Sequence, residues 1–134
     1  MNAAFIAVPA GRGYLNEVAG QLAKAGYAVE STGEQGHRRL FVERNGEHVW
    51  IFNENDPDEM PREFGKLVQQ ATTEVLVVEY YSLSLAKKIL ELLVTADDFI
   101  VDNDHGASLP GPEFIQRLRA QPSCDWRIEP TQGK

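Results

Sequence analysis

The sequence predicts an α+β fold, in which helices pack on one sheet within a single domain. An Asn45-Gly46 pair stands between two strand-like runs, which is a strong local signal for a β-hairpin. One strand–helix–strand pattern precedes the hairpin and another follows it, which predicts a mixed, mostly antiparallel sheet. A chain of 134 residues can form one domain with a real core and leaves little room for a second. We expect residues 1–130 to form this domain and residues 131–134 to be a loose tail.

The first strand–helix–strand unit precedes the hairpin. The apolar run at residues 4–8 ends at Pro9 and predicts a strand. Apolar residues recur at helical spacing over residues 14–25, and Gly26 follows as a stop signal. Residues 27–31 predict a second strand, and the connection between the two strands is long enough for a helical crossover.

The predicted hairpin, residues 38–53, has two different faces. A two-residue turn fixes the register, so that Leu40 lies opposite Ile51 and Phe41 lies opposite Trp50. The aliphatic face should belong to the core and consists of Leu40, Val42, Val49 and Ile51. The other face is aromatic and polar and consists of Phe41, Trp50 and Phe52, flanked by Arg39, Glu43 and His48. Two interpretations of the aromatic face stay open, namely burial under a helix or tail and partial exposure toward a partner.

An acidic segment follows the second strand of the hairpin. Residues 53–61 are polar and contain two prolines, which predicts a loop. Its carboxylates are Glu54, Asp56, Asp58 and Glu59. Because the strand runs directly into this loop, an aromatic centre would be surrounded by negative charge, as in many protein interfaces. We therefore expect the loop to bind a partner together with exposed members of the Phe41, Trp50 and Phe52 face.

The C-terminal half predicts a short helix, an interior strand, a helix, a strand and a final helix. Their ranges are 61–70, 74–80, 84–95, 98–102 and 112–121. The strand at 74–80 is apolar on both sides at its centre, which places it inside the sheet. Ser82 or Ser84 should cap the following helix, whose buried stripe includes Leu92. Pro112 fits the first turn of the last helix, and Pro122 ends it.

Composition and charge favour some partners over others. The formal net charge of −7 and the pI near 4.9 oppose binding to nucleic acid or to anionic membranes and favour a basic protein partner. No apolar run approaches the roughly 20 residues of a membrane-spanning helix. The N-terminus lacks the features of a signal peptide, and a single cysteine, Cys124, cannot form an internal disulfide. We expect a cytoplasmic protein, and its oligomeric state stays open.

One loop gathers reactive side chains but completes no known catalytic pattern. Asp102, Asp104 and His105 make this loop a secondary candidate site. Its glycine, Gly106, is at the fifth position, whereas a calcium loop needs glycine at the sixth. Near the N-terminus, Asn16 replaces the third glycine of a dinucleotide-binding pattern. We therefore predict no catalytic residue, no metal and no cofactor, and we favour a non-enzymatic protein over an enzyme.

Two alternatives to a protein-binding function stay open. A small hydrolase or metal-dependent enzyme would use the Asp102–His105 loop, with His105 near both a carboxylate and a nucleophile. A small-ligand sensor domain would instead enclose an apolar pocket between a helix and the sheet.

The last third of the chain combines an acidic turn, a proline-glycine helix entry and a basic helix. These features are carried by Asp102–Gly106, Leu109–Gly111, Glu113-Phe114, Arg117–Arg119 and Asp125-Trp126, with Ser84–Leu90 upstream. In these segments the chain resembles small bacterial immunity proteins, which neutralise polymorphic or contact-delivered toxins. The resemblance implies a cognate protein toxin as partner and assigns no individual residue a role. An acidic surface is compatible with this function, because it accelerates association with a basic toxin.

Overall fold

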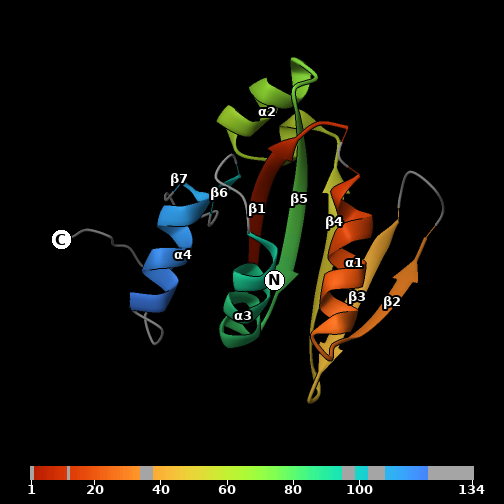
Figure 1. Cartoon of the computed structure of the whole chain (residues 1–134). Coiled ribbons are helices and arrows are strands. Elements are labelled where there is room, and N and C mark those ends of the chain that lie inside the picture. The colour runs from red at the N-terminus through yellow and green to blue at the C-terminus, as the bar shows by residue number, and fades with distance from the viewer. Residues whose placement is uncertain (1, 12, 34–37, 95–98, 103–107, 121–134) are drawn as a thin grey trace.

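The protein is built on one seven-stranded sheet, seen here in a computed structural model (Figure 1). The structure describes residues 2–11, 13–33, 38–94, 99–102 and 108–120. The strand order is β2-β3-β4-β5-β1-β6-β7, and each pair of neighbours is antiparallel. Four α-helices accompany the sheet within these residues, so the predicted α+β class with a central Asn-Gly hairpin is confirmed.

The elements follow the predicted order. The strands are β1 (Asn2–Pro9), β2 (Ala28–Thr32), β3 (Arg39–Arg44), β4 (Glu47–Glu54), β5 (Thr73–Tyr80), β6 (Ile100–Asp102) and β7 (Ser108–Pro110). The helices are α1 (Tyr14–Lys24), α2 (Arg62–Gln69), α3 (Leu83–Leu93) and α4 (Gly111–Ala120), with a short 3-10 helix, η1 (Pro57–Glu59). Two elements were not predicted. η1 begins at a proline in the segment expected to be a loop, and β7 is only three residues long.

The hairpin between β3 and β4 has the predicted register. Asn45 and Gly46 have φ angles of 54° and 82°, as the two central residues of a type I′ turn require. Phe41 is paired with Trp50 and Leu40 with Ile51. The aliphatic face is buried as expected, because Leu40, Val42, Val49 and Ile51 are each 0% exposed.

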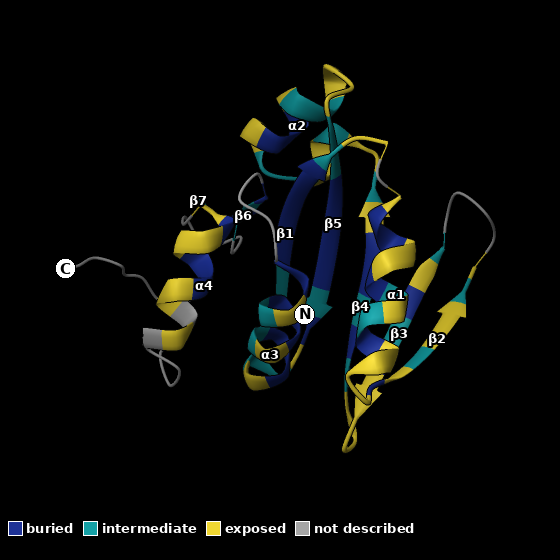
Figure 2. Cartoon of the chain, viewed as in Figure 1, coloured by how far each residue is buried: buried dark blue, intermediate teal, exposed yellow. Residues whose placement is uncertain are grey.

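One face of the sheet is covered by α1, α3 and α4, which pack on a large apolar core (Figure 2). Ser82 caps α3, since its Oγ accepts a hydrogen bond from the Leu85 backbone N–H at 3.2 Å. The predicted buried stripe of α3 is wrong at Leu92, which is 37% exposed. Leu92 lies at the margin of the stripe, and Leu90 is buried in its place beside the expected Leu93.

A buried tyrosine links the two central helices. Tyr14, in the first turn of α1, donates a hydrogen bond from its hydroxyl to the backbone carbonyl of Leu93 at the end of α3. Its ring also packs edge-on against Phe99, with 5.1 Å between ring centroids. The hydroxyl therefore has a partner in an apolar interior, where an unsatisfied polar group would be costly.

The opposite face of the sheet has a smaller cover. α2 packs there over a second cluster of buried residues, which consists of Phe5, Ala7, Phe52, Phe64, Val75 and Val77. α2 also packs closely on η1, and Gly65 makes this contact possible. A Cβ built on Gly65 would be 2.8 Å from the backbone oxygen of Pro57. The sequence thus positions the acidic segment around η1 through a glycine in the neighbouring helix.

We predict that Gly65→Ala destabilises the protein by about 1–3 kcal/mol, the usual cost of overpacking. The added methyl group would meet a backbone atom, so α2 and η1 must move apart. Gly20→Ala is the matched control, because Gly20 lies in α1 and a Cβ there would meet nothing within 4 Å. The control should gain up to about 1 kcal/mol from better helix propensity. Chemical denaturation of both variants measures the difference, and equal stabilities would contradict the packing described for Gly65.

Candidate protein-binding surface

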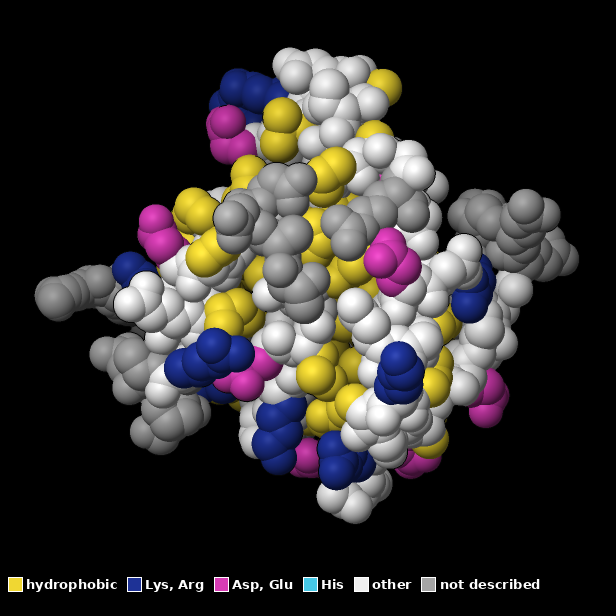
Figure 3. Space-filling model, in the orientation of Figure 1, with side chains coloured by type: hydrophobic (Ala, Val, Ile, Leu, Met, Phe, Trp, Pro, Cys, Tyr) yellow, Lys and Arg dark blue, Asp and Glu magenta, His cyan; other side chains and the backbone are white. Residues whose placement is uncertain are grey.

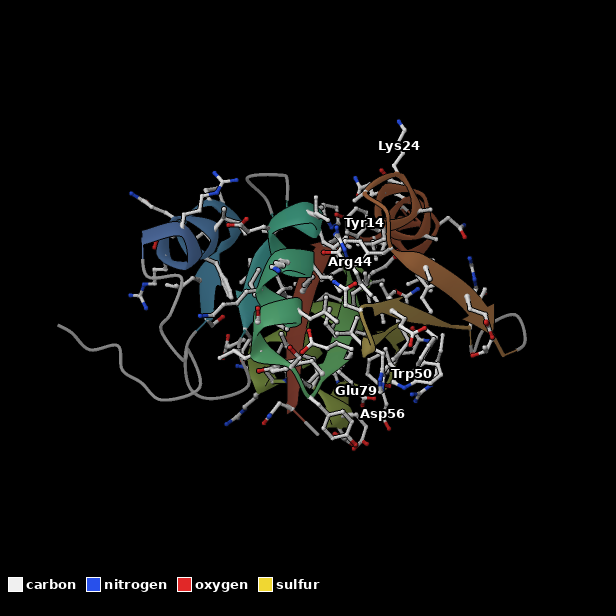
Figure 4. All side chains as sticks on the ribbon, turned by 90° about the horizontal axis from the view of Figure 1, so that it is seen from below. Tyr14, Lys24, Arg44, Trp50, Asp56 and Glu79 are labelled. Carbon is white, nitrogen blue, oxygen red and sulfur yellow. The ribbon has the colours of Figure 1, made fainter. Side chains whose placement is uncertain are left out.

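On the sheet side opposite α1 and α3, no described helix covers part of β3, β4 and β5. Figure 4 shows Trp50 and Glu79 projecting to one side of the sheet, with Tyr14 and Lys24 on the other. α2 covers the part of this side that lies over β1, β5 and the end of β4. Phe41, His48 and Trp50, which lie toward the hairpin turn, are only half-buried. The aromatic face of the hairpin is therefore partly open.

Four rings form a connected surface, which we call the aromatic strip: Phe41, His48, Trp50 and Tyr81. Phe41 stacks on His48 at 5.0 Å and packs edge-on against Trp50 at 4.9 Å, measured between ring centroids. His48 lies 6.1 Å from Tyr81, whose residue surface is 64% exposed. Because these rings already hold one another in place, a partner would lose little side-chain entropy by binding them.

Phe52 differs from the two other predicted aromatic residues. It is only 8% exposed and belongs to the apolar cluster under α2. The guanidinium carbon of Arg39 lies 4.1 Å from the centre of the Phe52 ring, so the Arg39 side chain covers the part of this ring that faces outward. Phe52 therefore supports the open surface, whereas Phe41 and Trp50 are the members that a partner can contact.

The acidic loop is partly held by its own carboxylates. Glu54 accepts a hydrogen bond from the backbone N–H of Asp56 at 3.1 Å, and Asp56 accepts one from Asp58 at 2.9 Å. The Asp56 bond caps η1. Asp58 and Glu59 are exposed and lie in the first turn of η1. The four predicted residues thus divide into two that shape the loop and two that offer charge to solvent.

Charge is unevenly distributed over the described residues. Alternation and element position place these acidic residues on the open side of β2–β5, η1 and α2: Glu30, Glu43, Glu54, Asp56, Asp58, Glu59, Glu63 and Glu79. The same region carries three basic residues, Arg39, Arg62 and Lys66. The helical side, shown in Figure 3, carries Lys and Arg interspersed with Asp and Glu. Among the described residues, carboxylates thus outnumber basic groups on the open side of the sheet.

Sequence reasoning missed three residues of this surface, namely Tyr81, Glu79 and Glu30. Glu79 lies beside Trp50 because β5 pairs with β4, and Glu30 lies beside Phe41 because β2 pairs with β3. Neither pairing is joined by a tight turn that would fix its register. Alternation along a strand can indicate which positions share a face, but only the long-range pairing shows which residues of different strands are neighbours.

The secondary candidate loop is described only at its start. Asp102 ends β6, where it is paired with Ser108 of β7, and it is half-buried. Asp104 and His105 lie outside the described residues. Within the described ranges no three His, Cys, Asp or Glu side chains are grouped as metal ligands would be. No helix in the same part of the chain is long and apolar enough to span a membrane.

Comparison with known proteins adds no relative. No family model, no curated protein and no solved structure matches the chain. Function must therefore be inferred from the surface itself.

We predict that Phe52→Ala and Phe41→Ala differ strongly in their effect on stability. Phe52 is buried under α2, so its truncation should cost about 3–5 kcal/mol, as for other core phenylalanines. Phe41 is half-buried in the open strip, so its truncation should cost clearly less. Urea denaturation of both variants tests this, and similar losses would show that the strip is as well covered as the core.

Proposed function

We propose that this protein is a non-enzymatic binding protein that inhibits a cognate protein toxin, as bacterial immunity proteins do, and acts in the cytoplasm. The observation that supports this most directly is the half-exposed aromatic strip, which lies in a region with a large excess of carboxylates. Aromatic residues surrounded by polar ones are typical of protein interface centres. The resemblance of the last third of the chain to immunity proteins supports the choice of a toxin as the partner.

Inhibition by such a surface needs no chemistry of its own. A bound protein that covers a toxin's active surface, or blocks its access to substrate, is sufficient. Burial of Trp50 and Phe41 would slow dissociation, because those rings would exchange water for a close-packed partner. The surrounding carboxylates would accelerate encounter with a basic partner. The two parts of the surface therefore contribute to different rate constants.

We predict that Trp50→Ala weakens partner binding by about 2 kcal/mol or more, mainly through faster dissociation. The partner is first isolated by affinity purification from the native host at low and moderate salt, and the kinetics are then measured by surface plasmon resonance. Leu92→Ala is the matched control, because Leu92 is also an exposed apolar residue but lies on α3, across the sheet.

The control should bind at the wild-type rates. Circular dichroism of each variant establishes that the fold is intact before binding is compared. A partner whose activity this protein does not inhibit, and which keeps its affinity for the Trp50→Ala variant, would contradict both the surface and the toxin assignment. If the partner binds through the aromatic strip but is not a toxin, the binding function would stand and the toxin assignment would be wrong.

We predict that a double charge reversal, Asp58→Lys with Glu59→Lys, slows association and weakens its salt dependence. These two carboxylates are exposed and are not the ones that hold the loop. Glu17→Lys with Glu113→Lys changes the net charge equally on exposed residues of α1 and α4, across the sheet from the strip and the loop. Since charges farther than about 8 Å are screened at physiological salt, the control should affect association much less. Equal effects of the two double variants would show that only the net charge of the protein affects the association rate.

A further inference from the structure

Four side chains of the open surface lie in one row across four strands. Glu30 of β2 is paired with Phe41 of β3, Phe41 with Trp50 of β4, and Trp50 with Glu79 of β5. Paired residues in a sheet point to the same face, so two neighbouring rings are flanked by a carboxylate on each side. We call this set the carboxylate–aromatic row. The four residues come from four different strands, so their order in the row depends on all three strand pairings.

The row has the chemistry of a site for a cationic side chain. The face of a tryptophan or phenylalanine ring attracts a cation, and a carboxylate beside the ring adds a charged hydrogen-bond acceptor. Neighbouring strands are about 4.8 Å apart, so each carboxylate lies next to one ring of the pair. Phe41 and Trp50 are half-buried, Glu30 is exposed, and the Glu79 side chain is 31% exposed. All four side chains thus reach solvent.

The protein itself supplies an example of the interaction. The guanidinium of Arg39 lies over the Phe52 ring at 4.1 Å, and its Nη1 is 3.7 Å from Glu79 Oε1. The Arg39 side chain is 49% exposed, so this ion pair is largely solvated and weak. An arginine from outside can therefore compete for Glu79. Arg39 is paired with Phe52, in the row next to the one that holds Phe41 and Trp50, and those two rings are half-exposed.

We propose that the carboxylate–aromatic row binds an arginine side chain presented by the partner protein. The guanidinium stacks on the Phe41–Trp50 pair and forms a charged hydrogen bond with Glu79 or Glu30. Arginine suits this site better than lysine, because its planar group can stack on a ring and pair with a carboxylate at once. The acidic surroundings of the row attract such a partner from a distance. The inference rests on the proposed binding function and specifies the chemistry of the partner.

The test uses an acetylated, amidated Gly-Arg-Gly-Arg-Gly peptide and its Lys and Glu counterparts. The full-length protein carries Trp126→Phe, which leaves Trp50 as the only tryptophan and its fluorescence as the readout. The Arg peptide should change Trp50 emission with saturation and bind at least about threefold tighter than the Lys peptide. The Glu peptide should leave the emission unchanged. Backbone amide NMR of the wild-type protein gives a second measurement that needs no substitution.

Two matched pairs of variants locate the site. Glu79→Gln should weaken Arg-peptide binding at least about threefold, whereas Glu47→Gln, with the same charge change on the other side of the sheet, should not. Arg39→Gln removes the internal competitor and should tighten binding. Arg44→Gln changes the net charge equally, but Arg44 lies over Tyr27 on the helical face and should have little effect.

Failure of this inference is distinguishable from failure of the proposed function. Equal affinity for the Arg and Lys peptides, equal effects within each pair of variants, or no binding at all would overturn the arginine site. The proposed function would still stand if the isolated partner lost affinity for Trp50→Ala. If the Arg peptide bound as expected but no partner required Trp50, the arginine chemistry would stand without the toxin assignment.

Discussion

The architecture depends on the pairing of β1 with β5, which joins the two halves of the sheet and must be protected on both faces. The two strands pair over their whole length, from Asn2 with Tyr80 to Pro9 with Thr73. Both are apolar on each side, so each face of the sheet centre needs a cover. α1 and α3 cover one face completely. Among the described residues, the other face receives only α2, a helix of eight residues that lies over β1, β5 and the end of β4.

The uncovered part of the second face explains its composition. Half-exposed aromatic residues lie on β3 and β4 where none of the described helices packs, and charged residues stand beside them. Arg39 illustrates this arrangement, since it covers Phe52 at the boundary between the buried and the open regions. A surface of this kind is stable without a partner, yet it gains free energy when a partner displaces the remaining water.

Local signals allowed the sequence to predict most elements and the faces of the hairpin. The Asn45-Gly46 turn fixes the β3–β4 register within a few residues, so the division between aliphatic and aromatic faces followed from alternation alone. The neighbours of the hairpin were not predictable in this way, because β5 joins β4 through η1 and α2, and β2 joins β3 through residues 33–38. Only the structure therefore shows that Glu79 and Tyr81 belong to the candidate surface. The short η1 and β7 carry no periodic pattern at all.

The two faces of the hairpin separate the core residues from the proposed binding surface. Val49 and Ile51 alternate with Trp50 along one strand, and the first two are fully buried while Trp50 reaches solvent. Val78 is likewise buried next to Glu79 on β5. A substitution on the open face therefore leaves the main core intact, because each exposed residue shares a backbone with core residues but not their contacts. The strip can change its chemistry, and hence the partner it fits, without a new fold.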